Sequence, residues 1–366
     1  MIKVLVVDDS ALMRKLIPQI LERDNMIQVV GTAMDGQFAL KKIGDLRPDV
    51  VTLDLEMPRM DGMETLREIM KHYNLPVIIV SAHTKAGAAA TFRALNIGAF
   101  DFVAKPRDVL SAQLEGIAQE LSTKIRVAAA SRKVKLVPAV AAAPPLRKVK
   151  LERRIAERAV AIGLSTGGPN ALRYLLTQLP SEFPAAVLVV QHMPEGFTET
   201  LARRLNEECA LDVKEAQSGD LLLSGRVLIC PGNRHIKIRR MPLGNIAVLT
   251  DEATVNGHRP SVDVLFRSLA REFGPDGVAV LMTGMGEDGA DGMGEVKASG
   301  GTTIAQNEES CVVYGMPRAA IERGHASRVL PLESIPGVLL AQCNLQTQQA
   351  NNGLAGGPRD EAARLK

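Results

Sequence analysis

Aromatic residues are scarce in this 366-residue chain: they make up 3% of it, and tryptophan is absent. The hydrophobic cores must therefore consist mainly of Val, Ile, Leu and Ala, a composition that suits buried parallel β-sheets. No apolar run reaches the roughly 18 residues that a membrane-spanning helix needs. The start of the chain, MIKVLVVDDS, also lacks the long apolar core of a signal peptide. We therefore expect a cytoplasmic protein.

Cysteine is scarce as well. The four cysteines lie far apart and form no CxxC pair, so we expect reduced thiols rather than disulfides or a zinc site. Positive charge is concentrated in one stretch: the formal net charge is +3, but residues 124–158 contain eleven Lys or Arg and two Glu, a net charge of +9. The remainder carries −6, which argues against a nucleic-acid partner for either flanking part.

The chain is long enough for two domains of ordinary size. Its first 122 residues alternate short apolar runs with stretches of helical periodicity, such as SALMRKLIPQILERD (10–24). The apolar runs are KVLVVDD (3–9), IQVVGTA (27–33), DVVTLDL (49–55), PVIIVSA (76–82) and DFVAKP (101–106). A repeated strand–helix pattern of this kind predicts a parallel sheet with helices on both faces.

Residues 123–157 lose this pattern and are rich in Ala, Pro and basic residues, which predicts a flexible linker. The alternation returns over residues 158–345 and predicts a second α/β domain with a mostly parallel sheet. Its strand runs are AVAIGL (159–164), AAVLVVQ (185–191), RVLICP (226–231), IAVLTD (246–251), GVAVLM (277–282) and GTTIAQ (301–306). The tail, residues 346–366, is polar and Gly-rich, and we expect it to be disordered.

Acidic residues follow two of the apolar runs in the first domain: Asp8 and Asp9 end the first run, and Asp54 ends the third. Because the carboxyl ends of parallel strands meet at one sheet edge, these carboxylates repel one another unless a cation joins them. A hard divalent ion such as Mg²⁺ fits an all-oxygen set of this kind. Ser81 and Lys105, at the ends of the fourth and fifth runs, supply the hydroxyl and the positive charge that a phosphoryl group on Asp54 needs.

The first domain resembles the response-regulator receiver domain over residues 1–122. The residues that carry the resemblance are the pair Asp8–Asp9, Asp54, Ser81 and Lys105–Pro106. It implies a flavodoxin-like fold and phosphorylation of Asp54 by a histidine kinase. The implied Mg²⁺ ligands are Asp8 (through water), Asp9, Asp54 and the backbone carbonyl of Glu56. Phe102 matches the position of the family's aromatic switch residue, although a core aromatic explains it equally well.

The second domain opens with a strand that ends at Ser165. Gly163–Gly167 satisfies G-x-S-x-G, between this strand and the helical stretch GGPNALRYLL (167–176). That context is typical of an exposed nucleophilic serine on a sharp turn. A phosphate-binding turn or a capped helix explains the pentapeptide alone slightly better, so the serine hypothesis depends on finding a base and an acid.

His192 is the best candidate for the base because it ends the next strand run, beside Ser165 at the same sheet edge. Histidines 235, 258 and 325 are expected to be ordinary solvated loop residues. The run GVAVLM is followed by three acids, Glu287, Asp288 and Asp291, of which Asp288 has the glycine neighbours of a tight turn. Backbone N–H groups of this loop, among them that of Met285, suit an oxyanion site.

The same loop also satisfies a different motif. Residues 284–289, GMGEDG, match the G-x-G-x-x-G dinucleotide fingerprint after a strand. Two acids inside the match would repel a pyrophosphate, and the match lies late in the chain rather than in a leading strand–helix–strand unit. A nucleotide-dependent oxidoreductase is therefore a weak alternative, as is a DNA-binding output, because no basic recognition helix stands out in the second domain.

Several longer motifs make the second domain similar to the catalytic domain of the chemotaxis protein-glutamate methylesterases, the CheB family. These are IGLSTGGP (162–169), QHMPEGFT (191–198), CPGNRHI (230–236), RPSVDVLF (259–266) and LMTGMGEDGADGM (281–293). The resemblance implies that Ser165 is the nucleophile, His192 the general base and Asp288 the orienting acid. Thr166 and Met285 match the family's oxyanion site, and no cofactor is expected in this domain.

The two resemblances together imply a cytoplasmic, phosphorylation-activated methylesterase of chemotaxis signalling. Its expected reaction is demethylation of glutamate methyl esters on chemoreceptors, with deamidation of receptor glutamines as a second activity. The expected partners are methyl-accepting chemoreceptors and a chemotaxis histidine kinase, with membrane contact only through the receptors. A phospho-regulated binding protein without catalysis is the main alternative, and the Ser165, His192 and Asp288 set argues against it.

Overall fold

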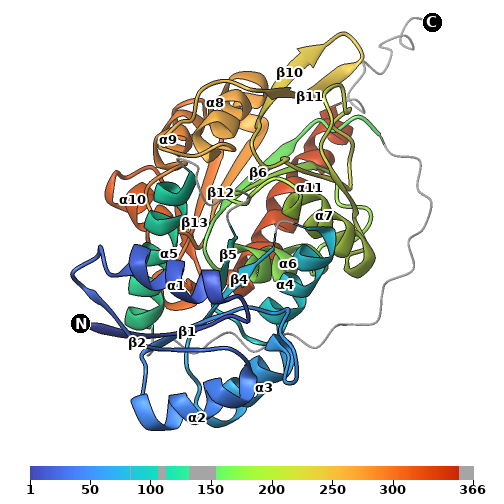
Figure 1. The fold of residues 1–366 in the computed structure, drawn as a ribbon. Helices are drawn as coiled ribbons and strands as arrows, with labels where there is room; N and C mark the ends of the chain where they lie inside the picture. The colour runs from blue at the N-terminus through green and yellow to red at the C-terminus, as the bar shows by residue number, and fades with distance from the viewer. Residues whose placement is uncertain (83, 106–112, 132–153, 354–366) are drawn as a thin grey trace, which may run out of the picture.

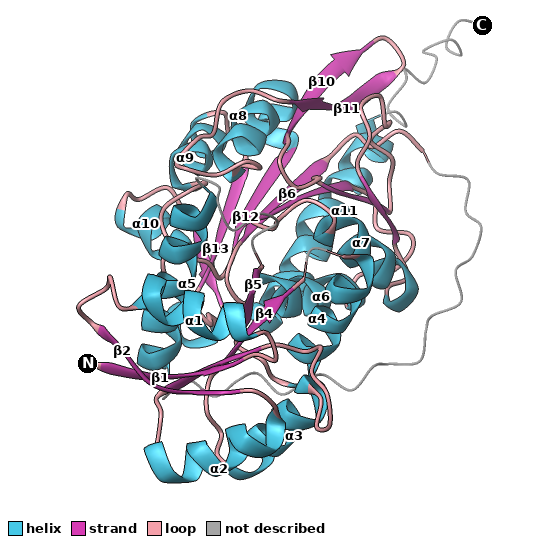
Figure 2. Ribbon diagram, viewed as in Figure 1, coloured by secondary structure: helices cyan, strands magenta, loops and turns pink. Residues whose placement is uncertain are grey.

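The computed structural model describes residues 1–82, 84–105, 113–131 and 154–353 (Figure 1). It contains two parallel sheets, each with helices on both faces, and therefore confirms the predicted α/β fold class (Figure 2). Most of the predicted linker lies outside the described residues. None of the helices that the structure describes is long and apolar enough to cross a membrane.

The first sheet has five parallel strands in the order β2-β1-β3-β4-β5, which is the flavodoxin-like order. The strands are β1 (Ile2–Val7), β2 (Ile27–Ala33), β3 (Val50–Leu53), β4 (Val77–Ser81) and β5 (Asp101–Ala104). The helices are α1 (Ala11–Leu21), α2 (Gly36–Leu46), α3 (Gly62–His72), α4 (Lys85–Ile97) and α5 (Gln113–Ala130). Side chains of α1 and α5 pack on one face, and those of α2, α3 and α4 on the other.

Local sequence explains where these helices begin. The residues Ser10, Asp35, Asp61 and Thr84 precede α1 to α4, and each side chain accepts a hydrogen bond from a backbone N–H in the first turn. Helix α5 continues to Ala130, beyond the boundary at residue 122 that the sequence predicts, because Leu121, Ile125 and Ala128 remain on its buried face.

The second sheet has seven parallel strands in the order β14-β13-β12-β6-β7-β9-β8. The strands are β6 (Ala159–Leu164), β7 (Ala186–Gln191), β8 (Asp212–Glu215), β9 (Arg226–Ile229), β12 (Gly277–Leu281), β13 (Thr302–Gln306) and β14 (Arg328–Leu330). The two edge strands, β8 and β14, were not predicted from the sequence. Both are short and less apolar than the central strands, so they lack the continuous apolar run used to find the others.

Helices cover both faces of this sheet: α6 (Gly168–Thr177), α7 (Phe197–Glu208) and α11 (Ile335–Gly353) pack on one face. The other face is covered by α8 (Val262–Phe273), α9 (Ala290–Ala298) and α10 (Met316–Glu322). Strands β10 (His235–Met241) and β11 (Gly244–Thr250) form a separate antiparallel hairpin. The structure places residues 346–353 in α11, where the sequence predicts the start of a disordered tail, because the packed first turns of that helix extend into the polar segment.

The two halves of the molecule are packed against each other. Helix α4 of the first half lies beside α6 and α7 of the second, as Figure 1 shows. The rings of Phe102 on β5 and Phe197 on α7 stack with centroids 4.8 Å apart. Val313, in the loop before α10, is buried in the cluster that α1 and α5 form on the first sheet. The carboxyl edge of the second sheet therefore faces the first half of the molecule.

Candidate active site and receiver site

Ser165 lies on a tight turn between β6 and α6. Its backbone N–H donates to Thr283 (3.0 Å), and its carbonyl accepts from Gly168 N–H (2.8 Å) and from the Gln191 side chain (2.8 Å). Gly167 adopts a left-handed conformation (φ 76°) at the turn. A Cβ atom added to Gly284 would lie 2.8 Å from the Cβ atom of Ser165. Only glycine at this position therefore allows the loop after β12 to approach Ser165 so closely. The turn is held from both sides and leaves the Ser165 side chain half-buried.

His192 occupies the equivalent position on the neighbouring strand. Leu164 of β6 pairs with Gln191 of β7, and the His192 backbone N–H donates to the Leu164 carbonyl (3.0 Å). Ser165 and His192 are therefore side by side at the carboxyl edge of the sheet, as the sequence predicts. The ring atom Nε2 of His192 lies 2.8 Å from Oδ2 of Asp288, while Nδ1 is buried and has no hydrogen-bond partner among the described residues.

Asp288 is 1% exposed and almost fully hydrogen-bonded. Its Oδ2 accepts from His192 and from the Val262 N–H (2.7 Å), and its Oδ1 accepts from the Ser261 hydroxyl (2.7 Å) and the Asn256 amide (3.2 Å). Burial raises the pKa of this carboxyl, but His192, Ser261 and Val262 outweigh burial and hold the pKa well below its usual range. Asp288 is therefore a fixed negative charge at the first turn of α8.

The other two acids of this loop do not join the site. Glu287 and Asp291 both form ion pairs with Arg323 and are more than half exposed. The dinucleotide alternative gains no support, because the motif's central acid, Asp288, is turned toward His192 and the start of α8. Among three acids in five residues, the structure brings only Asp288 to His192, in agreement with the sequence prediction.

Thr166 and Met285 flank Ser165. The Thr166 carbonyl accepts from the Thr283 hydroxyl (2.9 Å), and Gly284 forms an isolated β-bridge with Tyr314, which fixes the Met285 loop. Within the described part of the chain, the backbone N–H groups of Thr166 and Met285 have no hydrogen-bond acceptor. Unused N–H groups beside a serine turn are the donors that an oxyanion needs. Both residues also contact the first half of the molecule, as described below.

The position of His258 was not predicted from the sequence. Its ring stacks on that of His192, with centroids 3.8 Å apart and an angle of 10° between the planes. His235, also expected to be solvated, is fully buried: its Nε2 contacts the Ala253 carbonyl and its Nδ1 accepts from the Ser261 N–H. The Asn256–Gly257 turn before His258 is the one local signal that the histidine is held in a defined position.

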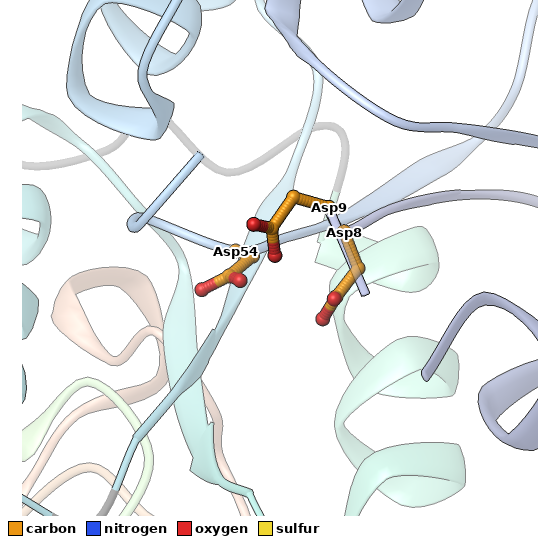
Figure 3. Close-up of side chains that lie close together, drawn as sticks. All are labelled: Asp8, Asp9 and Asp54. Atoms are coloured by element: carbon orange, nitrogen blue, oxygen red, sulfur yellow. The ribbon is translucent and has the colours of Figure 1, made fainter. Parts of the chain in front are cut away.

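The carboxyl edge of the first sheet gathers the predicted acids. Asp8, Asp9 and Asp54 place carboxylate oxygens within 4.8 Å of one another, and Figure 3 shows their side chains at neighbouring strand ends. Lys105 Nζ lies 2.6 Å from Asp54 Oδ2 and 2.9 Å from Asp8 Oδ2. Burial raises the pKa of Asp54, and Asp8 adds to this effect, although Lys105 opposes both.

This acidic group fits a divalent cation. The Asp8 Oδ2 atom is buried, and the ammonium of Lys105 is its only donor among the described residues; Asp9 is exposed and open to a ligand. An all-oxygen set with one accessible side is the chemistry that Mg²⁺ prefers. Glu56 directs its backbone N–H to Asp54 Oδ1 (3.3 Å), so its carbonyl lies in the loop next to the acids.

Ser81 and Phe102 are placed less directly. The Ser81 hydroxyl is buried and donates to the Gly87 carbonyl in α4 (3.2 Å) rather than to the acidic group. Phe102 is buried, 4% exposed, and stacks on Phe197 of the second half. The ring is therefore a core aromatic, and it also forms a contact between the two halves; its role as a switch residue stays a prediction.

The receiver-like half covers the serine site. Burial raises the pKa of Asp101 on β5, while Lys124, the Phe102 N–H and the neighbouring Thr166 side chain oppose that effect. Met285 packs against the cluster that α1 and α5 form. At the rim, Lys85 pairs with Glu199 (2.9 Å) and Asn170 donates to the Leu95 carbonyl (3.2 Å). Both predicted oxyanion residues thus contact the first half.

Comparisons with known proteins agree with both halves. A response regulator receiver domain model matches residues 4–115, and a CheB methylesterase model matches residues 160–339. A protein-glutamate methylesterase/protein-glutamine glutaminase of Koribacter versatilis (strain Ellin345) is 59% identical, over 94% of this chain and 97% of the relative. A relative with the same name from Symbiobacterium thermophilum is 49% identical, over 91% and 95%.

One solved structure is also similar to the second half. The crystal structure of the Thermotoga maritima CheB methylesterase catalytic domain is 43% identical and covers 50% of this chain and 97% of its own, with a TM-score of 0.49. The identity to the curated relatives extends through the first half as well as the second. The chain therefore belongs to the CheB methylesterase family and carries a response regulator receiver domain in front of its methylesterase domain.

Proposed function

We propose that this enzyme hydrolyses glutamate methyl esters on chemoreceptors, with Ser165 as nucleophile, His192 as general base and Asp288 as orienting acid. The observation that carries the proposal is the 2.8 Å contact between His192 and the buried Asp288, beside Ser165 at one sheet edge. The relatives named protein-glutamate methylesterase/protein-glutamine glutaminase support the substrate.

The reaction is an acyl transfer through a serine ester. His192 keeps its Nε2 proton on Asp288, so its unpartnered Nδ1 takes the Ser165 proton as the serine oxygen attacks the ester carbonyl. The N–H groups of Thr166 and Met285 stabilise the negative oxygen of the tetrahedral intermediate. The intermediate collapses, methanol leaves with the proton from His192, and the glutamyl group remains on Ser165.

Water completes the cycle. His192 accepts a proton from a water molecule, which attacks the glutamyl–serine ester and releases free glutamate and Ser165. The same steps on a glutamine side chain release ammonia instead of methanol, so deamidation of receptor glutamines is the expected second activity. Asp288 remains ionised throughout, because five donors hold its carboxylate.

Phosphorylation of Asp54 is the proposed control. A chemotaxis histidine kinase supplies the phosphoryl group in this proposal. Asp9, Asp54, the Glu56 carbonyl and, through water, Asp8 would hold Mg²⁺, which would neutralise charge on the acids and on the phosphoryl oxygens. Lys105, between Asp8 and Asp54, is poised to pair with a phosphoryl oxygen, and Ser81 must leave the Gly87 carbonyl to donate to one.

In this proposal, the contacts between the two domains make the unphosphorylated enzyme less active. Asp101 and Phe102 on β5 contact Thr166 and Phe197, so the receiver occupies the approach that a receptor helix requires. Lys105 follows β5 directly, so a change at the phosphorylation site acts on the strand that makes these contacts. Phosphorylation shifts the population toward a form with separated domains.

The test is methanol release from methylated receptor membranes, with and without acetyl phosphate and Mg²⁺. We expect release that rises with the phosphodonor, disappears in Ser165→Ala, and remains at the basal rate in Asp54→Asn whether or not the donor is present. Absence of release from folded wild-type enzyme, on membranes that a control esterase demethylates, would contradict the proposed substrate and favour a binding protein.

A further inference from the structure

The rings of His192 and His258 lie face to face. Their centroids are 3.8 Å apart and their planes differ by 10°, which is full van der Waals contact between two flat rings. His258 comes from the loop between β11 and α8, far from His192 in sequence, and no step of the reaction described above uses it. The face of the proposed general base that His258 covers is therefore closed to solvent and fixed in direction.

The backbone around His258 is built to hold this ring. Val255 and His258 exchange two backbone hydrogen bonds of 3.0 and 2.9 Å. Between them, Asn256 (φ 53°) and Gly257 (φ 77°) are both left-handed, the geometry of the tight Asn-Gly hairpin turn. A short turn closed by two hydrogen bonds allows little change in the direction of the His258 side chain.

The same turn also touches the acid. The Asn256 amide donates to Asp288 Oδ1 (3.2 Å) and to Asp263 Oδ2 (2.8 Å), and the Asp263 carboxylate accepts the Gly292 N–H (2.7 Å). One four-residue segment thus contacts both members of the His192–Asp288 pair, with a ring on the histidine and an amide on the acid.

We propose that the turn at residues 255–258 is a positioning element for the His192–Asp288 pair and that His258 is the positioning residue for His192. The stacked ring blocks rotation of the His192 imidazole, which keeps Nε2 on Asp288 and leaves Nδ1 free to take the serine proton. This role rests on the proposed serine mechanism, and His258 acts through His192 rather than on the substrate.

The charge of the second ring suits this role. Burial and, to a lesser extent, the neighbouring His192 lower the pKa of His258 to about 4, although Asp288 and, from α5 of the receiver, Glu120 act in the opposite direction. His258 is therefore neutral at physiological pH. A neutral ring supports His192 without repelling the imidazolium that forms when His192 takes the serine proton.

Two substitutions of His258 distinguish the effect of a flat stacked ring from the effect of the ring nitrogens. His258→Ala removes the stack and leaves His192 free to rotate, and misplacement of a catalytic group by about 1 Å reduces rates by roughly 100-fold. His258→Phe keeps a flat ring in contact with His192 but carries no nitrogen. His325→Ala is the matched control, because His325 is also a partly buried loop histidine whose Nδ1 contacts a backbone carbonyl, that of Ala290 (2.8 Å), and it does not stack on His192.

The experiment uses the full-length enzyme and two readouts. The first is the rate at which a fluorophosphonate probe labels Ser165, which requires an activated serine but no receptor. The second is kcat and KM for methanol release from methylated receptor membranes. We expect His258→Ala to lower the labelling rate and kcat by about 10- to 100-fold with KM within about twofold. His258→Phe should recover to within about fivefold of wild type, and His325→Ala should match wild type.

Two results would overturn the inference: wild-type labelling by His258→Ala, or equal losses in His258→Phe and His258→Ala when circular dichroism shows both folded. If His258 had a purely structural role, His258→Ala would lower thermal stability without a selective loss of kcat at nearly constant KM. Ser165→Ala is run alongside. If Ser165→Ala is labelled at the wild-type rate, Ser165 is not the activated nucleophile, and both the serine mechanism and the inference are wrong. If Ser165→Ala is not labelled, the results for the His258 variants test the role of His258 separately from the serine mechanism.

Discussion

The two sheets of this enzyme each present a buried aspartate at the carboxyl edge, and the two acids differ in their electrostatics. Asp54 of the receiver is 4% exposed, and burial raises its pKa although Lys105 lies 2.6 Å away. Asp288 of the methylesterase domain is 1% exposed, and its pKa lies well below the usual range. Burial alone therefore does not determine the charge state of an acid at such an edge.

The difference lies in the number of hydrogen-bond donors around each carboxylate. Asp288 accepts from His192, Ser261, Asn256 and the Val262 N–H at the first turn of α8. Asp54 accepts from Lys105 and from the Glu56 N–H, and Asp8 stands beside it as a like charge. An acid that is saturated with donors is a fixed structural charge, whereas an under-satisfied acid remains available for a phosphoryl group or a cation.

The same substitution should therefore lower basal activity at one edge and leave it unchanged at the other. Asp288→Asn removes the charge that orients His192 and stabilises its protonated form, and we expect a loss of roughly 10³- to 10⁴-fold in kcat. Asp54→Asn should keep the basal rate and lose only the response to acetyl phosphate. Methanol release from receptor membranes measures both variants.

Circular dichroism and thermal melting supply the control for this pair, since both variants must be compared as folded protein. If Asp288→Asn kept a basal rate within tenfold of wild type, Asp288 would not be part of the mechanism. The two aspartates would then not differ in their effect on basal activity.

The second prediction concerns the contact that links the two edges. Phe102→Ala removes the ring that stacks on Phe197 at 4.8 Å, weakening the closed arrangement of the domains. An aromatic pair contributes about 1 kcal/mol beyond its buried area, so we expect basal activity without phosphodonor to rise about fivefold. Phe100→Ala is the matched control, because Phe100 is buried inside the receiver core rather than stacked on Phe197. Equal activation by both variants would show general loosening of the receiver.

The third prediction uses pH. The pKa of Asp288 in the folded enzyme lies below its value of about 3.9 in an unfolded chain, so its charge stabilises the fold above that pH and the contribution is lost on acidification. Between pH 6 and pH 3, wild type should lose about 1 kcal/mol more unfolding free energy than Asp288→Asn. Urea unfolding at the two pH values measures this. Asp291→Asn, which changes an exposed acid paired with Arg323, should behave as wild type.

Periodicity of apolar residues was sufficient to predict the fold class, because the central strands of both sheets are continuous apolar runs. The same periodicity was sufficient to predict that Ser165, His192 and Asp288 lie at one sheet edge, because all three follow such runs. His258 was not predictable in this way, because its position depends on a turn that folds back over the sheet. The short edge strands and the contact of Phe102 with Phe197 were also missed, because they depend on tertiary packing that leaves no periodic signal.

The smallest predicted effect is at the rim of the domain contact. Lys85 and Glu199 form an ion pair of 2.9 Å between α4 and α7, but the two side chains are 77% and 54% exposed. Pairs of this kind contribute about 0–1 kcal/mol, less at high salt. Lys85→Ala should therefore raise basal methanol release by less than about threefold, and 0.5 M NaCl should remove the difference from wild type. A salt-insensitive increase as large as that of Phe102→Ala would place the main resistance to domain opening at this rim rather than at β5. It would also separate the control of the serine site from the strand that leads to Lys105 and the proposed phosphorylation site.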